Sequence, residues 1–359
     1  MKTALILNFT GNGYHFGCFG TAREIYAQLQ EKGYLVNYLT VKISHGTMVV
    51  PKKLSDFSSR EFVNKYITNN NAIYSSIIES DIVVVNGEGT LHRLAKGPIH
   101  LLFMMHLSKL ILRKPTYLIN HSCFPTLDGK DNTKVYAKII KELDGVVPRE
   151  QLTKQFYDQV GISAELGFDS LPLYFDRAGL GNARSTLKGS GKIVLAGGIN
   201  YSAAAVKSLS QAMNKLDKTI AFQFLLGGKQ DLAKDEIPIY EAYRKAGLII
   251  ELVEAKTFSH WVETIATAKG LISARFHYTI AAFALGTPVI SMPSNTPKIE
   301  AIHELLGHGG AFSWAEAGKL ASATQMVEGL LHGAHDVSDA TMQKVRELAK
   351  VNYNVIPSV

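Results

Sequence analysis

Short β-rich runs alternate with helical patterns along the whole chain. This alternation is typical of parallel sheets whose strands are joined by helical crossovers. The ten candidate strands cover residues 4–9, 34–41, 81–88, 115–120, 145–150, 192–199, 220–228, 248–255, 270–277 and 288–293. The pattern therefore predicts a fold of the α/β class.

A glycine-rich and mostly polar stretch at residues 176–192 interrupts the pattern once. It has no sustained apolar period, which is typical of a linker. The chain has 359 residues, enough for two ordinary domains. We therefore predict two doubly wound, Rossmann-like domains that face each other across a cleft, at residues 1–176 and 190–359. In such sheets, ligands bind beyond the carboxyl ends of the strands.

The charge and the cysteine content restrict the partners and the compartment. A net charge of +7 and a pI near 9.1 favour anionic partners. The lysines and arginines are dispersed and form no zinc-finger, RNP or basic-zipper pattern, so we expect no nucleic acid. The two cysteines are too few for a disulfide framework, which favours the reducing cytoplasm. Their spacing from the histidines matches no zinc motif, so we expect no metal.

The longest apolar stretch, residues 98–113, is interrupted by two histidines and a lysine. It is too short and too polar to span a bilayer. We therefore expect at most peripheral contact with the inner face of the cytoplasmic membrane.

A glycine-rich loop follows the first strand, and Gly17 and Gly20 in it lie next to the start of a helix. Such a loop can bring backbone N–H groups close to an anion or a sugar oxygen. It can equally be only a tight turn. The spacing differs from G-x-G-x-x-G, so it does not predict a dinucleotide site.

Polar side chains also follow the third and fourth predicted strands. Asn86 and Glu88 end the third strand, where the carboxylate can act as a base towards a hydroxyl, cap a helix or pair with an arginine. Asn120, His121 and Ser122 follow the fourth strand on the predicted cleft side. His121 can be an acid or a base, although an isolated histidine is more often a hydrogen-bonded structural group.

The second half contributes the stronger group of polar residues. Arg275 and His277 are two positions apart at a predicted strand end, where an extended backbone points both side chains the same way. Lys298 begins the helix after the next strand. A guanidinium, an imidazole and an ammonium group together suit a small, multiply charged anion. Separate surface pairings, with Glu300 or Glu263, are the alternative.

The segment "SARFHYTIAAFALGTPVISMPSNTPKI" closely resembles the signature of the polysaccharide pyruvyl transferase family. Looser similarities run through most of the chain, in "GCFGTAREI", "NGEGTLH", "NHSCFP", "VVPREQLT" around Arg149 and "LGFDSLPL" around Asp169. The predicted substrate-binding residues are Gly17, Asn86, Asn120, Ser122, Arg149, Ser294 and Lys298, and the predicted catalytic residues are Glu88, His121, Arg275 and His277.

The resemblance implies a glycosyltransferase-B-like fold and phosphoenolpyruvate as the donor, with no separate cofactor. It also implies a product in which a pyruvate ketal bridges two hydroxyls of a sugar in a surface polysaccharide or its lipid-linked precursor. In that chemistry His277 is the expected acid or phosphate ligand, and Glu88 or His121 the expected base.

Two other functions remain open. Asn86 and Glu88 stand where the family has glycines, which also suits a glycosyltransferase that uses a nucleotide-activated sugar and Glu88 as its base. A non-catalytic protein that binds a glycan or an anion on the same fold is the second alternative.

Overall fold

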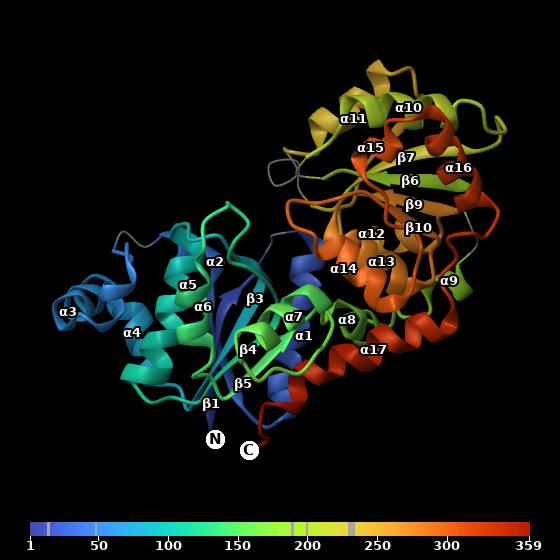
Figure 1. The fold of residues 1–359 in the computed structure, drawn as a ribbon. Coiled ribbons are helices and arrows are strands. Elements are labelled where there is room, and N and C mark those ends of the chain that lie inside the picture. Colours follow the sequence, from blue (N-terminus) through green and yellow to red (C-terminus); the bar gives the residue numbers. More distant parts are fainter. Residues whose placement is uncertain (13–14, 47–48, 188–189, 199, 229–233) are drawn as a thin grey trace. The chain divides into compact units, whose positions relative to one another are not determined.

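A computed structural model describes residues 1–12, 15–46, 49–187, 190–198, 200–228 and 234–359. The chain forms two compact α/β units, each built on one five-stranded parallel sheet (Figure 1). A strand is present at each of the ten predicted positions, although residue 199, the predicted end of the sixth strand, lies outside the described residues. The predicted fold class, two parallel-sheet α/β domains, is confirmed.

Unit 1 contains Met1–Asn12, Thr21–Ser170 and the C-terminal segment Leu348–Val359. Its sheet has the strand order β2-β1-β3-β4-β5. The strands are β1 (Thr3–Phe9), β2 (Leu35–Thr40), β3 (Ile82–His92), β4 (Thr116–Phe124) and β5 (Gly145–Pro148). The strands β1, β3 and β4 are buried along almost their whole length, as is usual for central strands of a parallel sheet covered on both faces.

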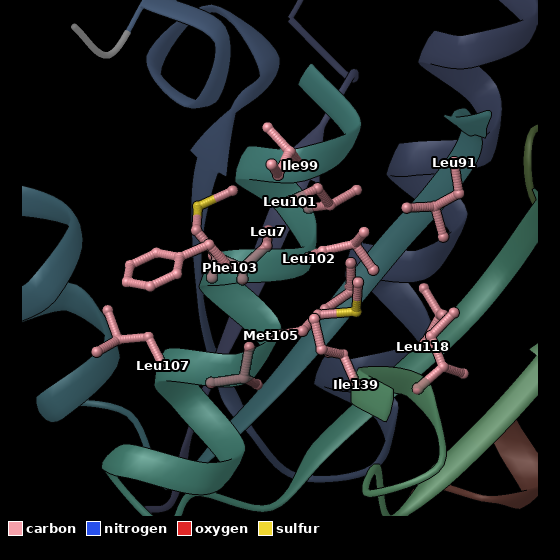
Figure 2. Close-up of a cluster of buried hydrophobic side chains, with 14 of the residues drawn as sticks. Leu7, Leu91, Ile99, Leu101, Leu102, Phe103, Met105, Leu107, Leu118 and Ile139 are labelled. Atoms are coloured by element: carbon pink, nitrogen blue, oxygen red, sulfur yellow. The ribbon is translucent and has the colours of Figure 1, made fainter. Parts of the chain in front are cut away.

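The apolar core of unit 1 lies between the sheet and helix α5 (Lys96–His106) (Figure 2). Leu102 and Phe103 of this helix belong to the same buried cluster as Leu7 and Leu118 of the strands. The other helices of the unit are α1 (Phe16–Glu31, from Thr21), α2 (Val41–Gly46), α3 (Arg60–Asn69), α4 (Asn71–Ile78), α6 (Thr133–Ile140) and α7 (Gln151–Gln159), with a 3-10 turn at Leu54–Ser58 and a π turn at Leu107–Ile111.

Unit 2 contains residues 15–20 and Leu171–Glu347. Its sheet has the strand order β10-β9-β6-β7-β8. The strands are β6 (Lys192–Ala196), β7 (Ala221–Leu226), β8 (Glu251–Glu254), β9 (Gly270–Ser273) and β10 (Val289–Ser291). The helices are α8 (Leu171–Arg177), α9 (Ala183–Thr186), α10 (Ala203–Met213), α11 (Ile237–Lys245), α12 (Phe258–Ala266), α13 (Phe276–Leu285), α14 (Lys298–Leu306), α15 (Trp314–Ala317), α16 (Leu320–Leu331) and α17 (Asp339–Asn354). Helices α10 and α16 lie on one face of this sheet, and α12 and α13 on the other (Figure 1).

The two units do not follow the predicted ranges 1–176 and 190–359. Unit 2 already begins at Leu171, so α8 and the described part of the predicted linker at 176–192 belong to it; residues 188 and 189 lie outside the described residues. Two helices also belong to both units, because α1 passes into unit 1 at Thr21 and α17 does so at Leu348.

The ends of β3, β4 and β9 each differ from the prediction by four residues, and each of these differences moves a candidate residue. β3 and β4 continue to His92 and Phe124, because their ladder extends through the pairs Glu88–His121 and Leu91–Cys123. The polar residues predicted to end β3 or to follow β4 therefore lie within these strands. β9 instead ends at Ser273, before the residues predicted to close it.

Among the described residues, no helix is long and apolar enough to cross a membrane.

Candidate functional site

Arg275 and His277 lie at the start of helix α13, not at the end of a strand as predicted. Arg275 is the N-cap residue with an extended backbone (φ −111°, ψ 128°), and His277 is the second residue of the helix. The chain turns here because the backbone N–H of Arg275 donates to the Ser273 hydroxyl at 3.0 Å. Arg275 and His277 are therefore close together because both lie in the first turn of a helix, and not because they lie on one face of a strand. Its partial positive charge adds to theirs.

Glu236 holds the Arg275 side chain. The Nε–H group of Arg275 donates to Glu236 Oε1 at 2.6 Å, and the Glu236 side chain is fully buried whereas that of Arg275 is 16% exposed. Burial raises the pKa of Glu236, and the charge of Arg275 opposes that shift. Among the described residues, the terminal nitrogens of Arg275 have no hydrogen-bond or ion-pair partner. The guanidinium can therefore bind a ligand through these nitrogens.

His277 packs against the first turn of α1, which belongs to the same unit. A Cβ atom placed on Gly17 would lie 2.2 Å from the His277 Cβ, so only a glycine permits this packing. The next residue, Cys18, has its Sγ 3.7 Å from His277 Nδ1. The predicted residue Gly17 thus makes room for an imidazole.

His15 lies near Arg275 and His277, a proximity that sequence reasoning missed. Burial, and next the charges of Arg275 and His277, lower the pKa of His15 to about 4, while Asp235 opposes the shift. His15 is therefore neutral near pH 7. Its position in the glycine-rich loop was the available signal, but the sequence does not show that this loop lies beside α13.

Ser294 lies between β10 and α14, and Lys298 is the first residue of α14. The Nζ of Lys298, the first residue of α14, donates to Asn295 Oδ1 at 2.9 Å and lies 5.7 Å from the centre of the Phe276 ring. Ser294 donates to the same Asn295 oxygen at 3.3 Å. Phe276 stands between Arg275 and His277 in the sequence, so Lys298 is tied to the start of α13.

A second polar cluster lies in unit 1, around Arg149. Its Nη1 is 2.6 Å from Asp169 Oδ2 and 3.5 Å from Glu88 Oε2, and its Nε donates to the Ser122 hydroxyl at 3.2 Å. Thr10 donates to the other Glu88 oxygen at 3.1 Å. The structure thus brings together three predicted residues, Glu88, Ser122 and Arg149. The arginine is buried between two carboxylates, which compensate its charge before any ligand binds.

Three non-glycine residues on adjacent strands of unit 1 have a left-handed backbone. They are Asn8 (φ 61°), Glu88 (φ 49°) and Asn120 (φ 52°). Asparagine tolerates this conformation, whereas glutamate rarely adopts it, so Glu88 carries the larger strain. The β3–β4 register is irregular directly after Glu88. Strained backbone of this kind is often found at functional sites, which supports a role for this carboxylate.

Asn86 and Asn120 connect strands inside unit 1. Both are fully buried, and the Asn120 side chain donates to Asn86 Oδ1 at 2.9 Å. The Asn8 side chain donates to the Asn86 carbonyl at 2.8 Å. These bonds give both predicted substrate-binding residues a role in holding the strand ends together.

His121 is enclosed in the core of unit 1. Its side chain is fully buried and its Nε2 lies 2.6 Å from the Tyr157 hydroxyl. Burial, and then the charge of Arg149, lower the pKa of His121 to about 3. A histidine in this environment stays neutral and is poorly placed to exchange a proton with a substrate. Its geometry therefore favours a structural role over the predicted catalytic one.

Comparisons with known proteins bear on the family and on the fold. A family model described as polysaccharide pyruvyl transferase matches residues 25–296, most of the chain. No curated protein matches the chain.

Several solved structures resemble the whole chain at low sequence identity. HepE from Anabaena, in complex with UDP-glucose, is 12% identical over 99% of this chain and 96% of its own, with a TM-score of 0.52. MurG from Acinetobacter baumannii is 12% identical over 99% of both chains, with a TM-score of 0.55. UDP-GlcNAc 2-epimerase from Neisseria meningitidis, bound to UDP-GlcNAc, is 11% identical over 99% of both chains, with a TM-score of 0.58. These likenesses show a GT-B-type fold.

Proposed function

The chain belongs to the polysaccharide pyruvyl transferase family, and we propose that it transfers pyruvate from phosphoenolpyruvate to a sugar as a ketal. The observation that carries this proposal is the cationic cluster of unit 2. There Arg275 and His277 lie at the N-terminus of α13, with their charges acting on His15. A compact anion is the ligand that such a cluster suits best.

Phosphoenolpyruvate matches the chemistry of these side chains. It carries a carboxylate and a phosphate, and the terminal nitrogens of Arg275 form a fork that fits two oxygens of either group. His277 is the proposed phosphate ligand or acid, and Lys298 the proposed point charge. The reaction needs no cofactor besides this donor.

The proposed reaction joins two sugar hydroxyls to C2 of phosphoenolpyruvate and releases phosphate. A proton adds to the methylene carbon of phosphoenolpyruvate, and a sugar hydroxyl adds to C2 as it loses its own proton. The C–O bond to phosphate then breaks, and the second hydroxyl closes the ketal on C2 with loss of its proton. Two hydroxyl protons are thus released, one balancing the proton taken up by carbon and the other leaving with the phosphate.

Glu88 is the proposed base for a sugar hydroxyl. Its carboxylate accepts a hydrogen bond from Thr10 and pairs with Arg149, which together fix its position, and its backbone is strained. The neutral, enclosed His121 suits this role less. The proposed acceptor is a saccharide or a lipid-linked oligosaccharide on the cytoplasmic side of the membrane.

A glycosyltransferase that uses a nucleotide-activated sugar is the alternative, because HepE and the epimerase were solved with UDP-sugars. Isothermal titration with phosphoenolpyruvate and with UDP-glucose separates the two. Binding of phosphoenolpyruvate alone supports the proposal, and binding of UDP-glucose alone overturns it.

Turnover needs its own measurement, since a non-catalytic anion-binding protein would also pass a binding test. Phosphoenolpyruvate is incubated with a panel of saccharide acceptors, and mass spectrometry follows the products. A mass gain equal to pyruvic acid less one water, together with phosphate release, is the expected result. Binding without turnover on any acceptor would favour the non-catalytic alternative.

A further inference from the structure

Glu236 is a fully buried carboxylate whose burial needs an explanation. It directly precedes α11 as its N-cap residue, yet its side chain makes no capping hydrogen bond. Burying an ionised carboxylate costs free energy unless a partner compensates it. The 2.6 Å bond from Arg275 Nε supplies this partner for Oε1, whereas Oε2 has none among the described residues. Pairing with Arg275 therefore accounts for the position of this side chain, and helix capping does not.

The sheet of unit 2 provides the space for this pair. β6 and β9 are neighbouring parallel strands, so Gly197, after β6, and Arg275, after β9, come to the same edge. A Cβ atom on Gly197 would lie 3.1 Å from Glu236 Cγ and 3.2 Å from Glu236 Cβ. A larger residue at this strand end would push the Glu236 side chain away. The local structure is thus built around the carboxylate.

The single bond through Nε determines which part of Arg275 a ligand can reach. A guanidinium is planar, so an acceptor on Nε restrains its rotation while leaving the terminal nitrogens for other oxygens. Those nitrogens have no hydrogen-bond or ion-pair partner among the described residues. A lysine in place of Arg275 has only one nitrogen in its head group. It could not bond to Glu236 through one nitrogen and bind two ligand oxygens through two others.

We propose that Glu236 is a positioning residue, which orients Arg275 so that its terminal nitrogens bind the carboxylate or phosphate group of the donor. This inference rests on the proposed function, since it takes Arg275 to be a ligand of the donor anion. It adds that the anionic group must offer two oxygens to a guanidinium held in one orientation.

Orientation and charge predict opposite effects of removing Glu236. The carboxylate reduces the positive charge around Arg275, so on charge alone its removal would tighten the binding of an anion. Loss of orientation would weaken binding, because a mobile guanidinium must be ordered when the ligand binds. The sign of the change therefore tests the proposal.

The experiment measures phosphoenolpyruvate binding by titration calorimetry for the wild type, Glu236→Ala and Glu236→Gln. Glu236→Ala is expected to weaken binding about tenfold. Glu236→Gln is expected to weaken it less, because an amide oxygen still accepts the Nε–H bond. Unchanged or tighter binding in Glu236→Ala would overturn the proposal. Asp176→Asn is the matched control, since it removes the carboxylate partner of Arg346 elsewhere in unit 2 and should leave binding unchanged.

A double-mutant cycle separates positioning from a general structural role. In the Arg275→Ala background, Glu236→Ala should change binding by less than about twofold, because its effect acts through the guanidinium. Independent, additive losses would contradict this mechanism. Thermal unfolding of each variant identifies any loss that comes from misfolding.

The anchoring itself can be measured without a ligand, which distinguishes failure of this inference from failure of the proposed function. In a ¹⁵N-labelled protein, the Nε–H signal of Arg275, assigned by its loss in Arg275→Lys, should exchange slowly with water. In Glu236→Ala it should exchange rapidly. Rapid exchange in the wild type would refute the anchoring whatever the donor is. Slow exchange without phosphoenolpyruvate binding would refute only the donor.

Discussion

Glu88 and His121 are paired residues on neighbouring strands, and their surroundings give them different chemistry. Glu88 accepts a hydrogen bond from Thr10 and pairs with Arg149, so its carboxylate lies among polar partners. His121 is enclosed and bonded to Tyr157, which favours a neutral imidazole. The sequence predicted that both residues lie at one edge of the sheet. It could not show which of them is enclosed, because burial depends on residues that are far away along the chain.

The depressed pKa of His121 predicts a pH dependence of stability. The pKa is lowered from 6.5 to about 3 on folding, so the unfolded chain binds the proton more tightly. The free energy of unfolding should therefore be unaffected above about pH 6.5 and fall as the pH drops towards 3. The contribution of this group reaches about 5 kcal/mol at most. Urea unfolding of His121→Gln should show a weaker fall between pH 6 and pH 4 than the wild type.

The exposed residue His260 supplies the control for this measurement. His260→Gln should keep the wild-type pH dependence. An identical pH dependence in His121→Gln and the wild type would show that His121 does not exclude a proton in the folded protein.

At the scale of elements, the candidate donor site depends on where two helices begin. α13 starts directly after the turn at Ser273, and the first turn of α1 packs against it at His277. The apolar pattern "GLISARFH" extended the predicted strand to residue 277, because a short apolar run looks the same in a strand and in a buried helix. The hydrogen bond from Arg275 N–H to Ser273 resolves this ambiguity in favour of the helix.

Gly17→Ala should destabilise the protein and weaken phosphoenolpyruvate binding. Alanine favours a helix over glycine by up to about 1 kcal/mol. The new Cβ, however, would lie 2.2 Å from the His277 Cβ, so the helices must separate or the imidazole must move. Overpacking of this kind costs about 1–3 kcal/mol, which outweighs the gain. Thermal unfolding and titration calorimetry measure the two effects.

Gly309→Ala is the matched control, because a Cβ there meets no atom within 4 Å. It should leave stability and binding close to the wild type. Wild-type behaviour of Gly17→Ala would mean that α1 and α13 do not pack at this position.

At the scale of the whole molecule, each unit is completed by chain segments remote in the sequence. The C-terminal segment joins unit 1, where the Asn352 side chain accepts from the Asn120 backbone N–H at 2.8 Å and donates to the Phe168 carbonyl at 2.7 Å. The Tyr353 hydroxyl donates to Ser170 at 2.7 Å. The amphipathic pattern of the C-terminal helix does not specify which segments it packs against, so the sequence alone does not predict these contacts.

Asn352→Ala should therefore weaken unit 1. It leaves the buried N–H of Asn120 and the carbonyl of Phe168 without these partners, at a cost of about 1–3 kcal/mol. Hydrogen exchange of the β4 amides should accelerate, whereas Asn354→Ala, at an exposed position of the same helix, should leave it unchanged. Equal exchange in both variants would show that the C-terminal segment does not stabilise β4.

The sequence by itself determined the ten strands, the division into two parallel sheets and the block containing Arg275, His277 and Lys298. Each of these depends on residues close together in the chain, whose order and apolar periodicity are contained in the local sequence. Only the tertiary structure decided that Glu236 holds Arg275, that Arg149 lies between two carboxylates, and that the C-terminal segment completes unit 1. The physical reason is that pairing and burial depend on contacts between distant segments, which a local pattern of apolar and polar residues does not specify.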